Sequence, residues 1–280
     1  MTKIKIVTDS TADISKAVAE KLDIQIVPLN ITINGETYLD GIDFTPTEYR
    51  EIMKQNKELP KSSQPSVGVF AEVFEKIKGE DVEILCITVA EKLSGTYQSA
   101  TMAAEVAEAN VTVFSSNYVT APMQVMVMEA VEMANKGCSM QEIIARLTVI
   151  RQNIKFFVAV DTLDNLVKGG RISKGAAMIG SFLNIKPILI FDEGTIVPTE
   201  KVRSTGQVIK FFMKNLQADL EGKTLKAISI VNVGADKGVQ TLIEEIKKVV
   251  TVENIEVFDA TAVLATHAGE GTLAICYLVE

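Results

Sequence analysis

Short apolar runs alternate with helical segments in the first half of the chain, and this order restricts the possible folds more than any other feature. Ile4–Thr8 and Ile24–Leu29 have the composition of strands, and a helix is predicted between them over Ile14–Lys21, with Asp13 as its cap. The segment Ile84–Phe114 repeats the order of strand, helix and strand. This order favours a parallel sheet with right-handed crossover connections, because a parallel neighbour is reached only across one face of the sheet.

Local signals mark several turns and helix ends. Asn34-Gly35 stands between two alternating runs, which predicts a β-hairpin. Thr45–Glu48 and Ser139–Glu142 have the spacing of capping boxes, in which a hydroxyl and a carboxylate each accept a hydrogen bond from the other residue's backbone N–H. Gln55–Ser66 is polar and irregular, so we expect either a linker or a functional loop there, with Ser66 capping the next helix.

Hairpin signals mix with helices in the second half of the chain. Asp192–Gly194 separates two apolar runs, a helix is expected to end at Phe182, and the last apolar run, Leu273–Val279, is expected to form a strand that closes the sheet. We therefore predict an α/β fold with two domains. Residues 1–152 form a domain with a mostly parallel, Rossmann-like sheet, and residues 153–280 form a domain with a mixed α/β sheet.

Composition disfavours several classes of function. The net charge is −8 and no block of Lys and Arg stands out, so we expect no nucleic-acid partner. No apolar run approaches the length of a membrane span, and the start of the chain lacks a signal-peptide pattern. Cys86, Cys138 and Cys276 lie far apart in apolar surroundings, as expected for reduced thiols of a cytoplasmic protein. One histidine and scattered thiols predict no metal or cofactor site, although a carboxylate-only metal site stays open.

The segment Ser94-Gly95-Thr96 lies where a predicted strand ends and a predicted helix begins. Free backbone N–H groups and the positive end of the helix dipole meet at such a point, which suits an anion. Ser94 or Thr96 acting only as a helix cap is the other interpretation. A third hypothesis is a small phosphate ligand at the same helix start, although the chain lacks the phosphate-loop motif G-x-x-x-x-G-K-[ST].

His267 is the only histidine and is predicted to lie in a glycine-rich turn between two strands. Its imidazole can donate a hydrogen bond to a carboxylate, and a purely structural role is the other interpretation. Ser94 and His267 together allow an alternative function, a serine hydrolase of acyl esters, although no G-x-S-x-G elbow surrounds Ser94. Gly169-Gly170-Arg171 is interpreted from its spacing as a helix C-cap followed by an exposed arginine.

Six segments, in order along almost the whole chain, resemble the DegV family of bacterial lipid-binding proteins. They are Thr8–Asp13, Ser62–Ser66, Leu93–Ala100, Leu166–Ser173, Leu183–Leu189 and the glycine turn at His267. The resemblance implies a two-domain α/β protein, without a catalytic centre of its own, that encloses one long-chain fatty acid between its domains. It also implies that Ser62, the Ser94-Gly95-Thr96 turn and His267 hold the fatty acid carboxylate.

The resemblance further implies a protein partner. Family members that serve a bacterial fatty acid kinase present the bound carboxylate to the kinase and carry the acyl-phosphate towards phospholipid synthesis. Arginines at the positions of Arg171 and Arg203 are associated with docking that kinase, and transient membrane contact is expected for lipid exchange. Three departures from the family pattern matter. Ser62 stands where the family usually has Thr, Glu270 stands where the glycine turn usually has Pro, and Ser115-Ser116 stands where the family often has Asp-Ser. A carboxylate at Glu270 changes the rigidity of the turn or repels an anion.

Overall fold

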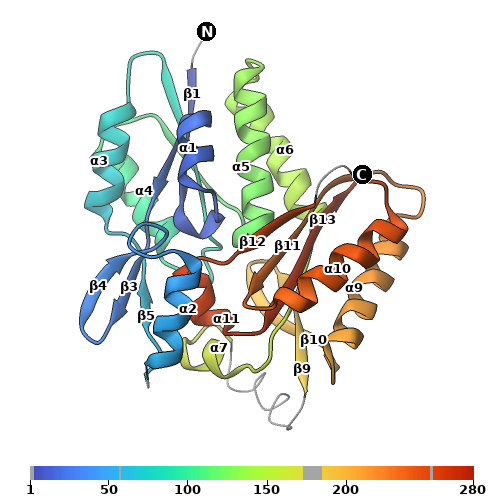
Figure 1. The fold of residues 1–280 in the computed structure, drawn as a ribbon. Coiled ribbons are helices and arrows are strands. Elements are labelled where there is room, and N and C mark those ends of the chain that lie inside the picture. The colour runs from blue at the N-terminus through green and yellow to red at the C-terminus, as the bar shows by residue number, and fades with distance from the viewer. Residues whose placement is uncertain (1–2, 57, 173–184, 253–254) are drawn as a thin grey trace. The chain divides into compact units, whose positions relative to one another are not determined.

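The computed structural model describes residues 3–56, 58–172, 185–252 and 255–280 (Figure 1). The chain divides into two compact units. The first comprises Met1–Asp43 and Lys61–Gln152, and the second comprises Phe44–Pro60 and Asn153–Glu280. Phe44–Pro60, which the predicted 1–152 domain includes, therefore belongs to the second unit. The reason is that its helix α2 (Pro46–Gln55) packs against helix α11 (Ala262–Ala268).

In the described part of the first unit, a parallel sheet has the strand order β2-β1-β6-β7. Its strands are β1 (Lys3–Asp9), β2 (Ile24–Val27), β6 (Val82–Thr88) and β7 (Val111–Ser115). Each neighbouring pair is parallel, as the strand-helix-strand order predicts. The carboxyl ends of β1 and β6 therefore lie next to each other, with Thr8 paired to Ile87.

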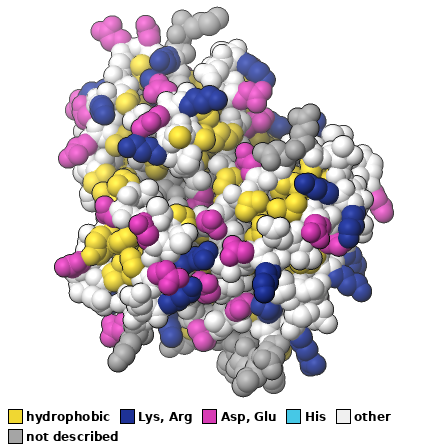
Figure 2. Space-filling view, viewed as in Figure 1, with side chains coloured by type: hydrophobic (Ala, Val, Ile, Leu, Met, Phe, Trp, Pro, Cys, Tyr) yellow, Lys and Arg dark blue, Asp and Glu magenta, His cyan; other side chains and the backbone are white. Residues whose placement is uncertain are grey.

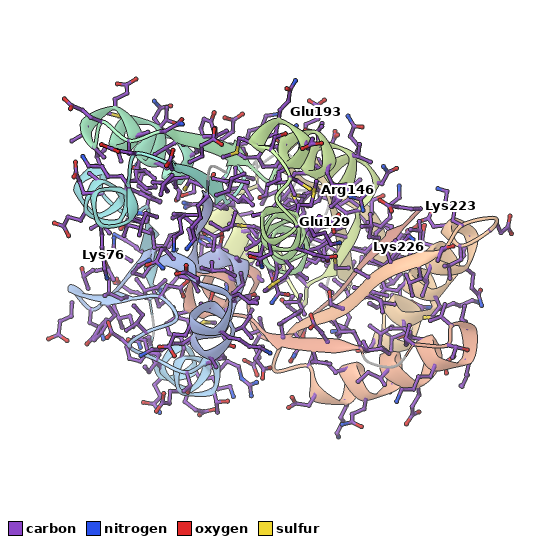
Figure 3. The ribbon with its side chains drawn as sticks, turned by 90° about the horizontal axis from the view of Figure 1, so that it is seen from above. Lys76, Glu129, Arg146, Glu193, Lys223 and Lys226 are labelled. Carbon is purple, nitrogen blue, oxygen red and sulfur yellow. The ribbon has the colours of Figure 1, made fainter. Side chains whose placement is uncertain are left out.

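Two adjacent helices, α3 (Val67–Ile77) and α4 (Thr96–Val106), cover one face of this sheet. Phe70 and Phe74 of α3 and small alanines of α4 pack against Val7, Ile84 and Cys86 of the strands. Helix α5 (Thr120–Asn135) also packs against β1 and β6. Helix α6 (Met140–Asn153) is joined to α5 by the ion pair of Arg146 and Glu129, whose Nε and Oε1 atoms are 2.6 Å apart (Figure 3).

A small antiparallel sheet in the first unit has the order β4-β3-β5 among the described strands. Strands β3 (Asn30–Ile33) and β4 (Glu36–Leu39) are joined by Asn34-Gly35, both with positive φ, so the predicted hairpin is confirmed. Strand β5 (Lys61–Ser63) pairs with β3 and places Ser62 opposite Ile31. The segment Gln55–Ser66, which looks like a loop from its composition, thus contains a strand that only its long-range partner defines.

In the second unit, the described strands form a mixed sheet in the order β10-β9-β8-β13-β11-β12. They are β8 (Lys155–Ala159), β9 (Lys186–Asp192), β10 (Thr195–Val202), β11 (Leu225–Val233), β12 (Glu256–Asp259) and β13 (Thr272–Val279). Among the described pairings, β11 with β12 is parallel and the others are antiparallel. The expectation that the last strand closes the sheet is wrong, because β13 lies between β8 and β11 and each of its residues is buried.

Helices α9 (Thr205–Asp219) and α10 (Asp236–Val249) lie side by side on the mixed sheet of the second unit (Figure 1). Phe212 and Leu216 of α9 and Leu242 and Ile246 of α10 are fully buried against strand residues such as Ile275. The short helix α7 (Asp164–Lys168) packs against α11. The helix expected to end at Phe182 lies outside the described residues.

The helix caps predicted from the sequence can be compared with the observed helix ends. The capping boxes at Thr45 and Ser139 are confirmed, since the backbone N–H groups of those residues donate hydrogen bonds to the Glu48 and Glu142 carboxylates. The predicted cap at Asp13 is wrong. Ser15 caps α1 (Lys16–Leu22) instead, and Asp13 ends a short 3-10 helix in a left-handed conformation.

Candidate functional site

The Ser94-Gly95-Thr96 turn lies at the carboxyl end of the parallel sheet, directly before helix α4. Gly95 occupies the N-cap position, so the interpretation of Ser94 or Thr96 as the helix cap is wrong. The Ser94 and Thr96 hydroxyl oxygens are 2.8 Å apart and hydrogen-bond each other, with Thr96 buried and Ser94 half-buried. The N-cap residue has no side chain to cap the first N–H groups of α4, and the first of them, Thr96 N, donates instead to Ser94 Oγ over 3.4 Å.

Gln64 is a site residue that the sequence does not single out. A Cβ atom on Gly95 would overlap the Gln64 side-chain amide, so glycine permits this close approach. Gln64 Nε2 also donates a hydrogen bond to Ser99 Oγ of α4 over 3.2 Å. Gln64 follows Ser62 by two residues, and these contacts bring the segment of Ser62 to the Ser94 turn. The one feature of the sequence that could have identified Gln64 is its position inside the Ser62–Ser66 segment, which resembles the DegV family.

Asp9, the last residue of β1, is a fully buried carboxyl group at the same sheet edge. It accepts hydrogen bonds from Val89 N over 2.7 Å, from Thr11 N over 3.0 Å and from Thr11 Oγ1 over 2.5 Å. Burial raises the pKa of Asp9 to about 6, although these hydrogen bonds act in the opposite direction. Through Val89, Asp9 holds the start of the loop that leads to Ser94.

Thr88, the last residue of β6, is fully buried, and its Oγ1 has no hydrogen-bond partner among the described residues. Alternate side chains of a strand point to the same face, so Thr88 faces the same side as Cys86, which packs against Ala100 and Ala103 of α4. A buried hydroxyl without a partner is costly. Thr88 is therefore a buried hydroxyl, on the sheet face that α4 covers, that a polar ligand can satisfy.

His267 lies in the second unit, in the last turn of helix α11, and not in a turn between strands. The prediction is wrong because Ala and Leu, which favour helix, lead into His267, and the helix ends only at Gly269 with φ of 82°. Gly271 also has positive φ and leads into β13. The two glycines thus follow His267 instead of surrounding it.

The imidazole of His267 packs against the end of helix α7. A Cβ atom on Gly169 would overlap His267 Nδ1, and Gly169 O accepts a hydrogen bond from Arg171 Nη1 over 2.6 Å. Burial, followed by the positive charge of Arg171, lowers the pKa of His267 to about 4, so the imidazole is neutral at pH 7. The predicted helix C-cap is confirmed by the positive φ of Gly170 and the bond from Arg171 N to Leu166 O. Arg171 itself is half-buried, and the expectation of an exposed arginine is wrong.

The remaining predicted residues lie apart from these contacts. Arg203 is exposed, and its backbone N–H donates to Gln207 Oε1 over 2.7 Å just before α9. Ser94 belongs to the first unit and His267 to the second. Within the first unit the hydroxyl partner of Ser94 is Thr96, which is not a general base, so this contact gives no support to a hydrolase.

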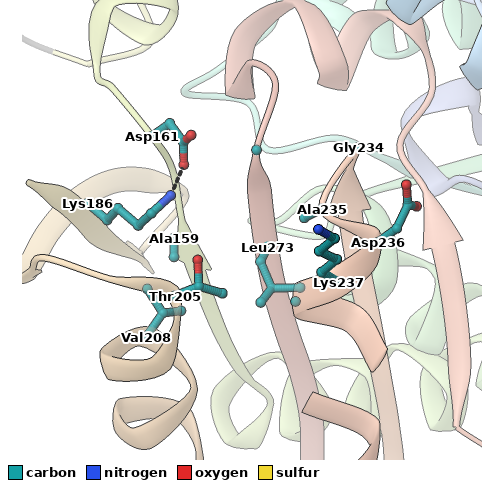
Figure 4. Close-up of a pocket in the computed structure, with 12 residues that line it drawn as sticks. Ala159, Asp161, Lys186, Thr205, Val208, Gly234, Ala235, Asp236, Lys237 and Leu273 are labelled. Carbon is teal, nitrogen blue, oxygen red and sulfur yellow. Dashed lines mark hydrogen bonds and ion pairs between the residues drawn. The ribbon is translucent and has the colours of Figure 1, made fainter. Parts of the chain in front are cut away.

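A pocket of about 340 Å³ lies in the second unit, between the starts of α9 and α10 (Figure 4). Its lining includes Lys186, which pairs with Asp161, as well as Thr205, Asp236 and Lys237. Two lysines and two carboxylates balance in charge, so the pocket has no net attraction for an anion. Its lining contains none of the site residues predicted from the sequence.

The described residues contain no group of three or more His, Cys, Asp or Glu side chains arranged to hold a metal ion. Within the same residues, no helix combines the length and apolar character that crossing a membrane requires. On the face shown in Figure 2, Lys and Arg side chains are interspersed with Asp and Glu side chains.

Fold and site together define a class: an α/β protein of two units whose candidate site offers neutral hydrogen-bond donors at the carboxyl end of a parallel sheet. The model of the DegV family, described as an uncharacterised protein family, matches residues 3–280, and the chain belongs to this family. The chain is 40% identical to a DegV domain-containing protein of Listeria monocytogenes, with 100% of both chains covered.

Solved structures give the same result. A DegV family protein from Thermus thermophilus, described by its fatty acid binding, has a TM-score of 0.92 and 31% identity, with 99% of this chain and 100% of that chain covered. A stearic acid-binding protein from Eubacterium ventriosum has a TM-score of 0.87 and 28% identity, with 98% of each chain covered. The predicted α/β fold, with a parallel sheet in the first half of the chain and a mixed sheet in the second, is therefore confirmed, and the structural neighbours carry fatty acids as ligands.

Proposed function

We propose that this protein binds a long-chain fatty acid, with the carboxylate at the Ser94-Gly95-Thr96 turn. The observation that carries the proposal is the start of α4. Its N-cap is a glycine, two hydroxyls flank that glycine, and the buried Thr88 hydroxyl has no partner among the described residues. The fatty acid ligands of the structural neighbours from Thermus thermophilus and Eubacterium ventriosum support the same ligand class.

The energetics of a fatty acid suit neutral donors. Burial of an acyl chain contributes about 0.8 kcal/mol per CH₂, so a chain of roughly fifteen carbons has a gross driving force of about 10 kcal/mol. The carboxylate then needs only hydrogen bonds that replace its contacts with water, whereas a lysine or arginine in the site would itself have to be desolvated. Ser62, Ser94 and the neutral His267 are donors of this kind, and all three stay predicted carboxylate ligands.

Extraction of the purified protein with organic solvent, followed by mass spectrometry, tests the proposal. We expect a long-chain fatty acid in one-to-one ratio with the protein, and protein that stays lipid-free after incubation with oleate would refute it. Labelling with a fluorophosphonate tests the alternative hydrolase function. Because we propose a protein without a catalytic centre of its own, we expect no covalent adduct at Ser94.

We further propose that the bound fatty acid is presented to a fatty acid kinase in the cytoplasm. The kinase would transfer the terminal phosphoryl group of a nucleoside triphosphate to a carboxylate oxygen, giving an acyl-phosphate for phospholipid synthesis and a nucleoside diphosphate. The exposed Arg203 suits a docking contact, and the half-buried Arg171 beside His267 suits a role closer to the ligand. The free cysteines among the described residues are compatible with a reducing compartment. Loading with lipid is expected to use transient contact with a membrane.

A further inference from the structure

Helix α2 is an insertion into the second unit from the first half of the chain. It begins with the capping box of Thr45 and Glu48 and packs against α11, the helix that carries His267. Of the described residues of α2, Tyr49 alone is buried, and its side chain is fully inaccessible to solvent. Tyr49 is therefore the side chain of α2 that contributes most buried surface to the packing of this helix.

The Tyr49 hydroxyl lies 2.5 Å from Thr266 Oγ1. Thr266 Oγ1 donates its own proton to Ala262 O over 2.7 Å, so Tyr49 must be the donor in the bond between the two side chains. Both residues are fully buried, which removes the competition of water for this bond. Thr266 directly precedes His267, so the bond fixes the turn of α11 from which the imidazole projects.

Helix α7 holds the same turn through other atoms. Asn165 Nδ2 donates a hydrogen bond to Thr266 O over 3.0 Å, and the backbone of Gly169 lies against the His267 ring. The residue before the histidine is thus tied to α2 by its side chain and to α7 by its backbone carbonyl. A loosened contact on the α2 side would let the imidazole move away from Gly169 towards water.

Glu270 makes a second connection between the end of α11 and α2. Its carboxylate lies 4.0 Å from Arg50 Nε and 3.7 Å from Lys54 Nζ, both on α2. A Cβ atom on Gly234 would overlap Glu270 Oε1, so this glycine permits the close approach of the carboxylate. Because the side chain is 43% exposed, its ion pairs are screened and each is weaker than the buried Tyr49 bond.

From these contacts we infer that Tyr49 and Glu270 are positioning residues, which clamp α11 onto α2 and so keep the His267 imidazole buried against Gly169. The clamp gives a role to Glu270, the residue that departs from the usual proline of the family's glycine turn. The effect of the clamp on fatty acid binding rests on the proposed function. The effect of the clamp on the burial of the imidazole does not, because it can be measured without ligand.

His267 is the only histidine, so its ring Cε1–H gives a single NMR resonance whose titration reports the imidazole alone. Among the elements packed against α11, helix α2 carries Glu48, Arg50, Glu51 and Lys54, and α7 with the residues after it carries Asp164, Lys168 and Arg171, while Glu270 follows α11 itself. Of these groups, Arg171 acts directly on the pKa of His267. In the wild-type protein the resonance should titrate near pH 4. In Tyr49→Phe we expect the pKa to rise by about half a unit or more towards its ordinary value, because an imidazole that is better hydrated accepts a proton more readily.

Glu270→Gln separates positioning from direct electrostatics. Removal of a nearby negative charge would by itself lower the pKa of an imidazole, whereas loosening of the clamp raises it. We expect a rise smaller than that in Tyr49→Phe. The matched controls are Tyr38→Phe, which removes a hydroxyl bonded to Glu36 on the small sheet, and Glu245→Gln, which removes a surface ion pair with Lys248 on α10.

Far-UV circular dichroism at each pH establishes that every variant is folded. A His267 titration unchanged in both folded variants, or changed equally in the controls, overturns the inference. If Tyr49→Phe does not fold, the His267 titration of Glu270→Gln alone tests the inference, and an unchanged pKa overturns it. With oleate added, Tyr49→Phe should bind about 3- to 10-fold more weakly than Tyr38→Phe. Wild-type protein that binds no oleate refutes the proposed function but leaves the ligand-free titration as a test of the clamp.

Discussion

Replacement of Asp9 by Asn is expected to remove a pH dependence of stability that arises from a buried carboxyl group. Burial raises the pKa of Asp9 from 3.8 to about 6 in the folded protein. The folded state therefore binds the proton more tightly than the unfolded state does. The resulting stabilisation is fully present below pH 3.8 and is lost as the pH rises through about 6. A rise of roughly two pKa units corresponds to about 3 kcal/mol.

Urea unfolding followed by circular dichroism at pH 4 and pH 7 measures this difference. The free energy of unfolding of the wild-type protein, relative to Asp9→Asn, should be greater at pH 4 than at pH 7 by up to about 3 kcal/mol. Other carboxylates titrate equally in both proteins and cancel. Asp81→Asn, which removes an exposed carboxylate of the same unit, is the control. A relative stability that is independent of pH, or greater at pH 7, would show that Asp9 is not held in the environment described.

Further variants test the site and its surroundings. Ser94→Ala should weaken oleate binding by about 1.5–3 kcal/mol in isothermal titration calorimetry, and Ser62→Ala by less; equal affinity of Ser94→Ala and wild type contradicts the carboxylate placement. Gly169→Ala places a methyl group against the His267 ring and should lower the free energy of unfolding by about 1–3 kcal/mol, so an unchanged melting temperature argues against this packing. Arg203→Ala should keep oleate affinity and lower the rate of phosphorylation by a cognate kinase, and an unchanged rate removes the docking role.

Local sequence patterns were sufficient where the interaction partners are close along the chain. The capping boxes at Thr45 and Ser139 and the hairpin at Asn34-Gly35 each depend on a few consecutive residues, and the structure contains all three. The parallel sheet of the first unit also follows from the order of its strands and helices. Local patterns failed at Asp13 because Ser15 competes for the same helix start, and at His267 because the residues before it form a helix that the glycines only end.

Sequence by itself determined most of the elements, the α/β class and the position of the Ser94 turn at a helix start, because these properties depend on local periodicity and backbone geometry. Only the tertiary structure decided that α2 packs on α11, that Gln64 lies on Gly95 and that Asp9 is fully buried. Each of these depends on residues far apart along the chain, whose contact is set by the packing of whole helices and strands. The physical reason is that burial and long-range hydrogen bonds are properties of the packed fold, which a local pattern does not encode.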